Sequence, residues 1–281
     1  MTTSPTAPTR VDATQFSGKD TMTRLIRQEY QTCFDMLVAA SEQEWHAQTP
    51  CDLWEVRDMA GHLLDAAYCY LGYFKQAEHG WPTEEPRGMR PYADALGRSA
   101  LQYRSVYRWE VLGRLEACTE LLFSYFDRLT EDEWAGKLVP HRWVGPVPAF
   151  MMAAFQLMDY SVHNWDLRKA LGQEAFVDHE ASDTLVPFMF GLMQICFAPE
   201  LAEGVDLSID VHISTSADEH WTVQVRDGQL TYQPGKPENP DATFTFPCHE
   251  FCLDVYQRLQ GGTASGDQPA IDTFRKLFFT I

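Results

Sequence analysis

Two aspartate–histidine pairs with the same spacing stand out as residues that could do chemistry. Asp58 precedes His62 in "WEVRDMAGHLL", and Asp159 precedes His163 in "LMDYSVHNWDL". On a helix, residues four apart lie on one face, so each pair presents a carboxylate and an imidazole together. A metal site needs such ligands to converge with at least one more from another element. One pair alone is typical of an ordinary hydrogen bond on a helix.

The pairs can meet only if the segments that carry them pack together. Apolar residues at helical spacing predict four long amphipathic helices, over about residues 22–41, 56–76, 92–129 and 144–172. The third is expected to break near Leu112-Gly113, and "VGPVPAF" is expected to open the fourth. Arg168 and Lys169 suit the negative end of the last helix, and Gly172 suits its C-terminal cap. Four such helices predict a bundle, whose core is a recurrent place for metals held by histidines and carboxylates.

The pattern changes in the C-terminal third of the chain. Strict alternation in "VDLSIDVHI", "WTVQV", "QLTYQ" and "ATFTF" predicts strands, and Asp227-Gly228 predicts a hairpin turn. Two short helices are expected after them, and an apolar connecting helix over residues 180–200. The fold class is therefore α+β, a helix bundle followed by a small α+β domain with an antiparallel sheet. The expected boundaries are a flexible N-terminus at 1–20, the bundle at 21–175 and the second domain at 180–281.

Composition limits the classes of partner. The net charge of −18 disfavours nucleic acid and anionic membrane surfaces, both of which attract clustered lysine and arginine. No apolar stretch is long enough for a membrane span or resembles a signal peptide. The seven cysteines are scattered, which is typical of reduced thiols. We therefore expect a cytoplasmic protein whose partners are small molecules, with no nucleic acid and no membrane; the sequence does not set the oligomeric state.

Two longer motifs contain the histidines. "LWEVRDMAGHLLDA" resembles the W-x-V-R-D-x-x-x-H-L signature of the mycothiol-dependent maleylpyruvate isomerase family, a branch of the DinB-like four-helix bundles. "DYSVHNWDLRKALG" resembles the family's second signature, and the C-terminal segment resembles a sterol carrier protein-like domain. Two signatures in the family's order are specific together. The resemblance implies a metal-dependent enzyme that uses mycothiol, the low-molecular-weight thiol of actinobacteria.

The resemblance also implies roles for particular residues. The family's metal ligands fall on His62, Asp159 and His163. The family commonly has glutamate where Asp159 stands, and the shorter arm favours a different substrate. Asp166 is expected either to orient the site from behind the ligands or to act as a polar anchor between helices.

Asp58 is interpreted as structural, because an acidic residue in the first turn of a helix is favoured by capping and by the helix dipole. The cap itself is less clear from sequence, because Glu55 stands where the family often has threonine and Asp52 is the alternative. Trp54 and Trp165 are interpreted as packing residues.

The C-terminal part contributes weaker candidates. In the resembling isomerases an arginine near the C-terminal helix reaches the active site, which makes Arg258 the first candidate for a catalytic residue and Arg275 the second. For each, a surface arginine at a helix end is an equal alternative. Cys248, His249 and Cys252 share a short segment, but no matching Cys or His pair follows, which argues against structural zinc.

Three functional hypotheses follow from these residues. In the first, a divalent metal, with Zn²⁺ preferred over Fe²⁺ or Ni²⁺, activates mycothiol for attack on a small electrophilic metabolite, by S-transfer in detoxification or secondary metabolism rather than by isomerisation. In the second, the protein is a thiol-independent tailoring enzyme of secondary metabolism acting on a bulky apolar substrate. It is either metal-dependent, since two histidines and a carboxylate suit non-haem iron, or metal-free. In the third, the protein is a non-enzymatic carrier of a small ligand.

Overall fold

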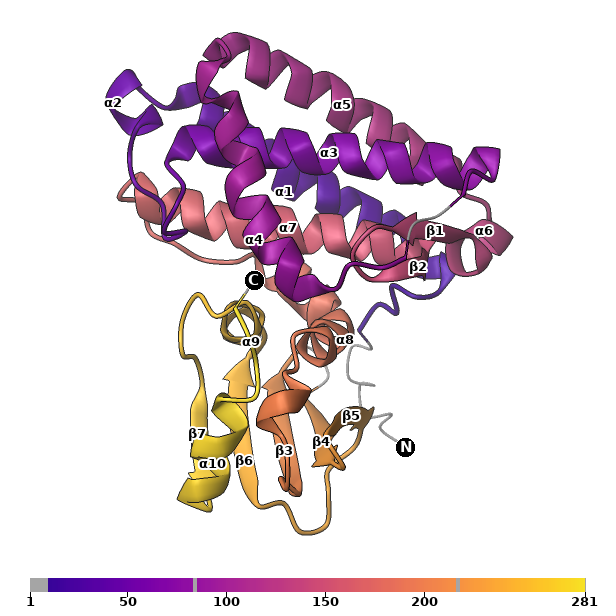
Figure 1. Ribbon diagram of the computed structural model, residues 1–281, viewed down its shortest axis with the longest axis vertical. Coiled ribbons are helices and arrows are strands. Elements are labelled where there is room, and N and C mark those ends of the chain that lie inside the picture. The colour runs from indigo at the N-terminus through magenta and orange to yellow at the C-terminus, as the bar shows by residue number, and fades with distance from the viewer. Residues whose placement is uncertain (1–9, 83–84, 216–217, 281) are drawn as a thin grey trace, which may run out of the picture. The chain divides into compact units, whose positions relative to one another are not determined.

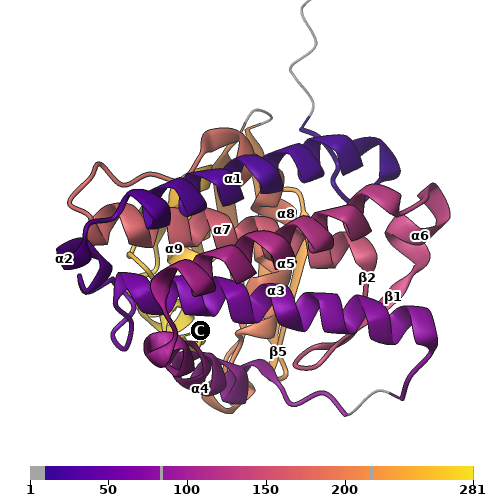
Figure 2. The ribbon, with the colours of Figure 1, turned by 90° about the horizontal axis from the view of Figure 1, so that it is seen from above.

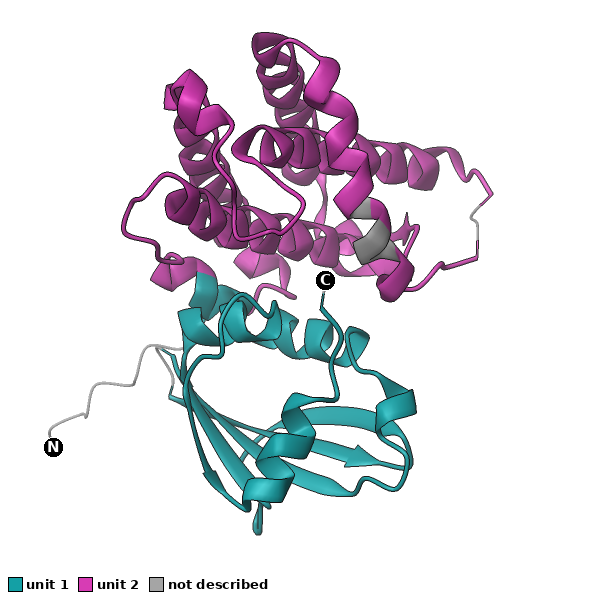
Figure 3. Ribbon diagram, turned by 60° about the vertical axis from the view of Figure 1, so that its left-hand side comes forward, with its two compact units in different colours: residues 1–11, 182–281 teal, residues 12–181 magenta. Residues whose placement is uncertain are grey.

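The computed structural model describes residues 10–82, 85–215 and 218–280 (Figure 1). The chain forms two compact units, coloured separately in Figure 3. One comprises Asp12–Ala181, and the other comprises Ser182–Ile281 with the N-terminal residues. Helices dominate the first unit and a sheet dominates the second, which confirms the predicted α+β class. Within the described residues, no helix has both the length and the apolar content needed to cross a membrane.

Four long helices form the bundle of the first unit and run alongside one another in Figures 1 and 2. They are α1 (Lys19–Ala39), α3 (Val56–His79), α5 (Arg108–Arg128) and α7 (Ala149–Ala170). Helix α1 packs on α7 and α5, and α3 packs on α5. Three of these helices alternate buried and exposed faces, whereas α7 is buried continuously from Met152 to Leu167. A helix buried on every side is normally apolar throughout. The polar residues of α7 therefore need partners or a function.

Short elements connect the four helices. They are the 3₁₀ turns Phe16–Gly18 and Ala100–Ser105, α2 (Glu42–Trp45), α4 (Met89–Ser99), α6 (Glu131–Gly136), β1 (Leu138–His141) and β2 (Gly145–Pro148). The predicted fourth helix was placed too early, because β1 and β2 form an antiparallel hairpin. Pro146 and Pro148 lack the backbone N–H that a helix interior requires. The helix therefore begins at Ala149.

The predicted third helix also needs correction. The chain breaks at Val106 and Tyr107, which are extended, and not at Leu112-Gly113. A glycine inside a helix costs only about 1 kcal/mol. Burial of Leu112 and Leu115 in the bundle offsets that cost.

The second unit is built on a five-stranded sheet in the order β5-β4-β3-β6-β7. Its strands are β3 (Leu207–Ser214), β4 (Glu219–Arg226), β5 (Gln229–Pro234), β6 (Ala242–Pro247) and β7 (Thr263–Gly266). Asp227 and Gly228 both have positive φ at the β4–β5 turn, as the hairpin prediction requires. The β3–β6 pair is parallel, so the sheet is not wholly antiparallel as predicted.

Helices complete this unit: α8 (His179–Ile195), α9 (Cys248–Val255) and α10 (Gln268–Arg275), with a 3₁₀ turn at Pro199–Leu201. Strand β7 was not predicted, because "TASG" has no apolar alternation and pairs only at the sheet edge. Its partner β6 supplies the apolar residues on that side of the ladder, Phe244 among them.

Candidate metal site

Three predicted ligand residues converge in the interior of the bundle. Helix α3 supplies His62, and α7 supplies Asp159 and His163 one turn apart. Asp159 Oδ1 lies 3.1 Å from His62 Nε2 and 3.2 Å from His163 Nε2. All three side chains are buried, and their ligand atoms lie within 4.8 Å of one another. Two imidazole nitrogens thus face one carboxylate oxygen.

His163 is held by a second carboxylate on its other side. Its Nδ1 lies 2.9 Å from Asp166 Oδ2, and Asp166 is completely buried one turn further along α7. If Nδ1 donates to Asp166, the imidazole presents Nε2 toward Asp159. Metal-binding histidines commonly make such a bond, because it fixes the ring orientation and the tautomer. His62 differs, because its buried Nδ1 has no hydrogen-bond partner among the described residues.

The electrostatics of the cluster favour a cation at this site. Burial alone would lower the pKa of His163, but the Asp159 charge and the bonds to Asp159 and Asp166 raise it to about 9. Burial alone would raise the pKa of Asp159, but the charges of His62 and His163 hold it well below its usual range. Without a metal, therefore, a proton on His163 compensates the buried carboxylates.

The donor set fits a divalent metal. Two imidazole nitrogens and a carboxylate oxygen are ligands of catalytic zinc sites, which keep one position open. Ligands about 2.1 Å from a tetrahedral ion are separated by about 3.4 Å. The two N···O distances of 3.1 and 3.2 Å are close to that value.

Trp54 forms one wall of the site. Its indole ring stacks on His62 with centroids 4.7 Å apart, and its Nε1 donates to the Gly97 carbonyl at 3.1 Å. His62 and His163 meet edge to face at 4.8 Å. Trp54 therefore packs directly against a candidate metal ligand, in agreement with the packing role predicted for it. Trp165, the other tryptophan interpreted as packing, is buried with its ring 5.2 Å from Lys169 Nζ.

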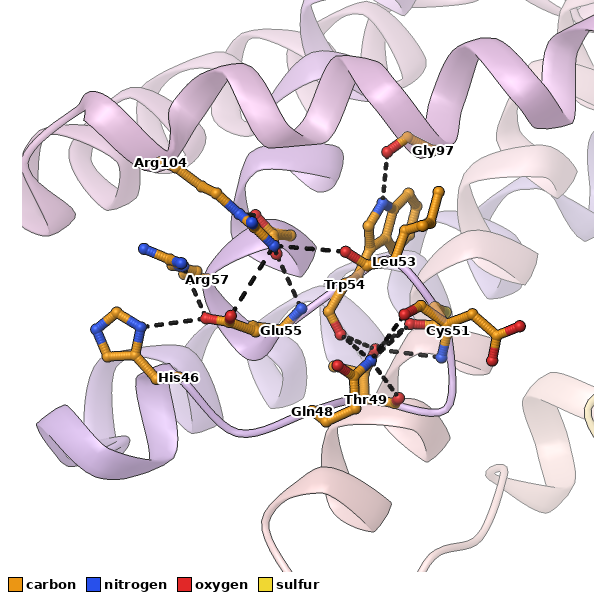
Figure 4. Close-up of polar contacts among 12 residues, drawn as sticks. His46, Gln48, Thr49, Cys51, Leu53, Trp54, Glu55, Arg57, Gly97 and Arg104 are labelled. Atoms are coloured by element: carbon orange, nitrogen blue, oxygen red, sulfur yellow. Dashed lines mark hydrogen bonds and ion pairs between the residues drawn. The ribbon is translucent and has the colours of Figure 1, made fainter.

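The loop before α3 carries both Trp54 and Cys51 (Figure 4), and these two residues contact His62 and Asp166 respectively. The Gln48 amide donates to carbonyl oxygens of the loop, including that of Trp54 at 2.9 Å, and Thr49 Oγ1 donates to the same oxygen at 2.7 Å. Cys51 Sγ lies 3.5 Å from Asp166 Oδ2. Cys51, His163 and Asp166 form a second group of potential ligands that sequence reasoning missed. The only available signal was the position of Cys51 three residues before Trp54.

Comparison with known proteins identifies the family. Residues 26–168, just over half of the chain, match the sequence profile described as Mycothiol maleylpyruvate isomerase N-terminal domain. The chain belongs to this family. A search of curated proteins found no significant sequence match.

Solved structures show the same fold across most of the chain. The mycothiol-dependent maleylpyruvate isomerase has a TM-score of 0.60 at 15% identity, covering 90% of this chain and 95% of that one. A histidine-to-alanine mutant of a mycothiol-dependent maleylpyruvate isomerase gives 0.59 at 14% identity with the same coverage. The colibactin self-resistance protein ClbS in complex with a dsDNA has a TM-score of 0.47 at 18% identity, covering 56% of this chain and 97% of that one.

The sequence predicts a structural role for Asp58. The contacts of its side chain agree with this prediction. Asp58 is completely buried at the start of α3, where it accepts a hydrogen bond from the Glu55 backbone N–H at 2.9 Å. Its two oxygens also accept from Arg104, at 2.8 and 2.6 Å. Glu55 is the N-cap residue, which rules out the alternative cap at Asp52. The two D-x-x-x-H pairs therefore differ in their contacts.

The C-terminal candidates lie in the second unit. Arg258 Nη1 donates to the Tyr256 carbonyl at 3.5 Å, and its guanidinium lies 5.3 Å from the ring centroid of Tyr256. Arg275 lies over Phe244 and lines a cavity of about 280 Å³ within this unit. A catalytic role for either arginine stays a prediction.

The cysteines of α9 are ordinary buried thiols. Cys248 Sγ lies 3.2 Å from Ser182 Oγ, and Cys252 is fully buried.

Proposed function

We propose that this protein is a metal-dependent enzyme that uses a low-molecular-weight thiol, mycothiol, to attack a small electrophilic metabolite. The observation that carries the proposal is the convergence of His62, Asp159 and His163 in the bundle of a maleylpyruvate isomerase family member. Three protein ligands leave at least one position of a divalent metal for an exogenous group. Zinc is the first choice, with Fe²⁺ and Ni²⁺ as alternatives.

A metal bound there would lower the pKa of a thiol and supply a thiolate near neutral pH. The chain's own residues prepare the site for that ligand. Asp166 fixes the His163 ring, and Trp54 fixes His62 by stacking. All three ligand side chains are buried, so the interaction between charges at the site is stronger than in solvent.

The reaction itself belongs to one of two types. In isomerisation, the thiolate sulfur bonds to one carbon of a C=C bond, whose electron pair moves onto the adjacent electron-withdrawing group. The resulting single bond rotates, and re-formation of the C=C bond breaks the S–C bond and expels the thiolate. In S-transfer, the S–C bond forms while the bond to a leaving group breaks, and the thioether is the product. We favour S-transfer in detoxification or secondary metabolism of an actinobacterial cytoplasm. Asp159 supports a substrate other than maleylpyruvate, because its side chain is one methylene shorter than the glutamate common at this position in the family.

A thiol-independent enzyme is the second candidate. Two histidines and one carboxylate also suit non-haem iron, so the same cluster would serve a tailoring enzyme acting on a bulky apolar substrate.

A non-enzymatic carrier of a small apolar ligand is the third candidate. It is supported by the cavity of the second unit, which is lined by Phe244, Phe246 and Phe274 among others. Neither the tailoring enzyme nor the carrier is proposed to have a nucleic acid or a membrane as partner.

Elemental analysis and thiol consumption separate these functions. The purified protein is expected to contain about one zinc per chain and to consume mycothiol when supplied with an electrophile such as monochlorobimane. His62→Ala should lose both the metal and the thiol consumption. Asp58→Asn is the matched control from the same helix and should keep both. Bound iron without thiol consumption would contradict the proposal and support the tailoring enzyme.

A further inference from the structure

Gln156 is a fully buried polar residue of helix α7. Neither Nε2 nor Oε1 of its side chain has a hydrogen-bond partner among the described residues. Buried polar groups are nearly always paired, and an exception in a native structure calls for an explanation. A missing ligand is one such explanation, because a bound molecule would supply the partner that the chain does not.

The position of Gln156 on α7 points toward the metal cluster. It precedes Asp159 by three residues and His163 by seven. At 3.6 residues per turn, these spacings place all three on one face of the helix, the face that meets His62. Gln156 therefore lies on the metal-facing side of α7, one turn nearer its N-terminus. The distance along the axis to Asp159 is about 4.5 Å, three residues at 1.5 Å each.

The surroundings of this turn are aromatic. Phe155, the neighbour of Gln156, stacks on His141 with ring centroids 5.2 Å apart. His141 also contacts Tyr70 and Tyr73 of α3. A carboxamide recognises a ligand by donating one hydrogen bond and accepting another. A secondary amide offers the complementary acceptor and donor.

We propose that Gln156 binds an amide group of the thiol cosubstrate, adjacent to its sulfur. The inference rests on the proposed function, which places the thiol sulfur at the metal. In thiols derived from N-acylated cysteine, the amide is attached to the carbon next to the CH₂–S group. It therefore lies a few ångströms from the sulfur, a distance similar to one helical turn. Gln156 thus selects amide-bearing thiols over simple ones.

Thiol binding to the zinc-loaded full-length protein tests this inference. The two probes are N-acetylcysteine and 3-mercaptopropionate, which both carry a carboxylate but differ in the amide. Calorimetric titration should show that the wild type binds N-acetylcysteine at least about fivefold more tightly, from two added neutral hydrogen bonds. Gln156→Leu should abolish this preference while leaving zinc content and 3-mercaptopropionate affinity unchanged. It should also raise the melting temperature of the thiol-free protein, because the unpaired amide is removed.

Two further variants complete the design. Gln156→Met, which keeps the side-chain length, should behave as Gln156→Leu and replaces it if leucine impairs folding. Ser161→Ala removes a buried hydroxyl five residues from Gln156, about 140° away around α7, and should retain the thiol preference. A preference for N-acetylcysteine that survives in both Gln156 variants would overturn the inference alone. Failure of both thiols to bind wild type would overturn the proposed function and the inference with it.

Discussion

Substitution of Asp166 by asparagine tests whether the hydrogen bond from His163 to Asp166 strengthens metal binding. Asp166 is completely buried, and its Oδ2 lies 2.9 Å from His163 Nδ1. Asparagine keeps the shape and an oxygen acceptor but removes the charge. A hydrogen bond to a charged group contributes about 1.5–3 kcal/mol and a neutral one about 0.5–1.5 kcal/mol. The difference of about 1–1.5 kcal/mol corresponds to a zinc affinity about tenfold weaker, within the 10–100-fold that is typical of such partners.

Competition with a chromophoric zinc chelator at neutral pH measures this affinity. Asp58→Asn is the matched control, because Asp58 is also a fully buried carboxylate but pairs with Arg104. It should lower the free energy of unfolding while leaving zinc affinity within about twofold of wild type. If Asp166→Asn binds zinc as tightly as wild type, our reasoning is refuted. Asp166 would then be a polar anchor between helices, the alternative that the sequence left open.

Three further predictions concern stability. Arg104→Gln removes the cation that pairs with buried Asp58 and should lower the free energy of unfolding in urea by about 1–3 kcal/mol; an unchanged value would contradict the contact described. Burial lowers the pKa of His141 to about 4, below the value of about 6.5 in the unfolded chain. The unfolded state therefore binds a proton that the folded state excludes, and stability falls as pH drops from 6.5 toward 4. His141→Phe should remove about 2 kcal/mol of the difference in stability between pH 7 and pH 5, and an identical difference in both proteins would refute the assignment. Zinc at 100 times its Kd should add about 2.7 kcal/mol to the stability of wild type and nothing to that of His62→Ala, as thermal denaturation with and without zinc would show.

Much of the fold follows from patterns that are local in sequence. The apolar spacing of α1 and α3 and the alternation in β3 and β4 are strong, because each element buries one face. The errors fall where the burial pattern is weak or the partner is distant. The β1–β2 hairpin lies between two helices and contains three prolines, and β7 is a four-residue strand at the sheet edge.

Only part of the candidate site follows from the spacing of its residues in the sequence. The i, i+4 spacing places Asp159 beside His163, but it cannot distinguish this pair from Asp58 and His62. Only the packing of α3 against α7 places His62 beside Asp159, whereas Asp58 pairs with Arg104. The contact of Cys51 with Asp166 and the lack of a partner for the Gln156 amide among the described residues emerge only from the three-dimensional structure. Neither residue belongs to a recognisable motif.

The most direct test of the central claim is a crystal structure of the zinc-loaded protein. We predict one ion bound by His62 Nε2, His163 Nε2 and an Asp159 carboxylate oxygen, each at about 2.0–2.2 Å. Asp166 should keep its hydrogen bond to His163 Nδ1. An ion bound instead by Cys51 with Asp166, or an Asp159 side chain turned away from the metal, would contradict the account.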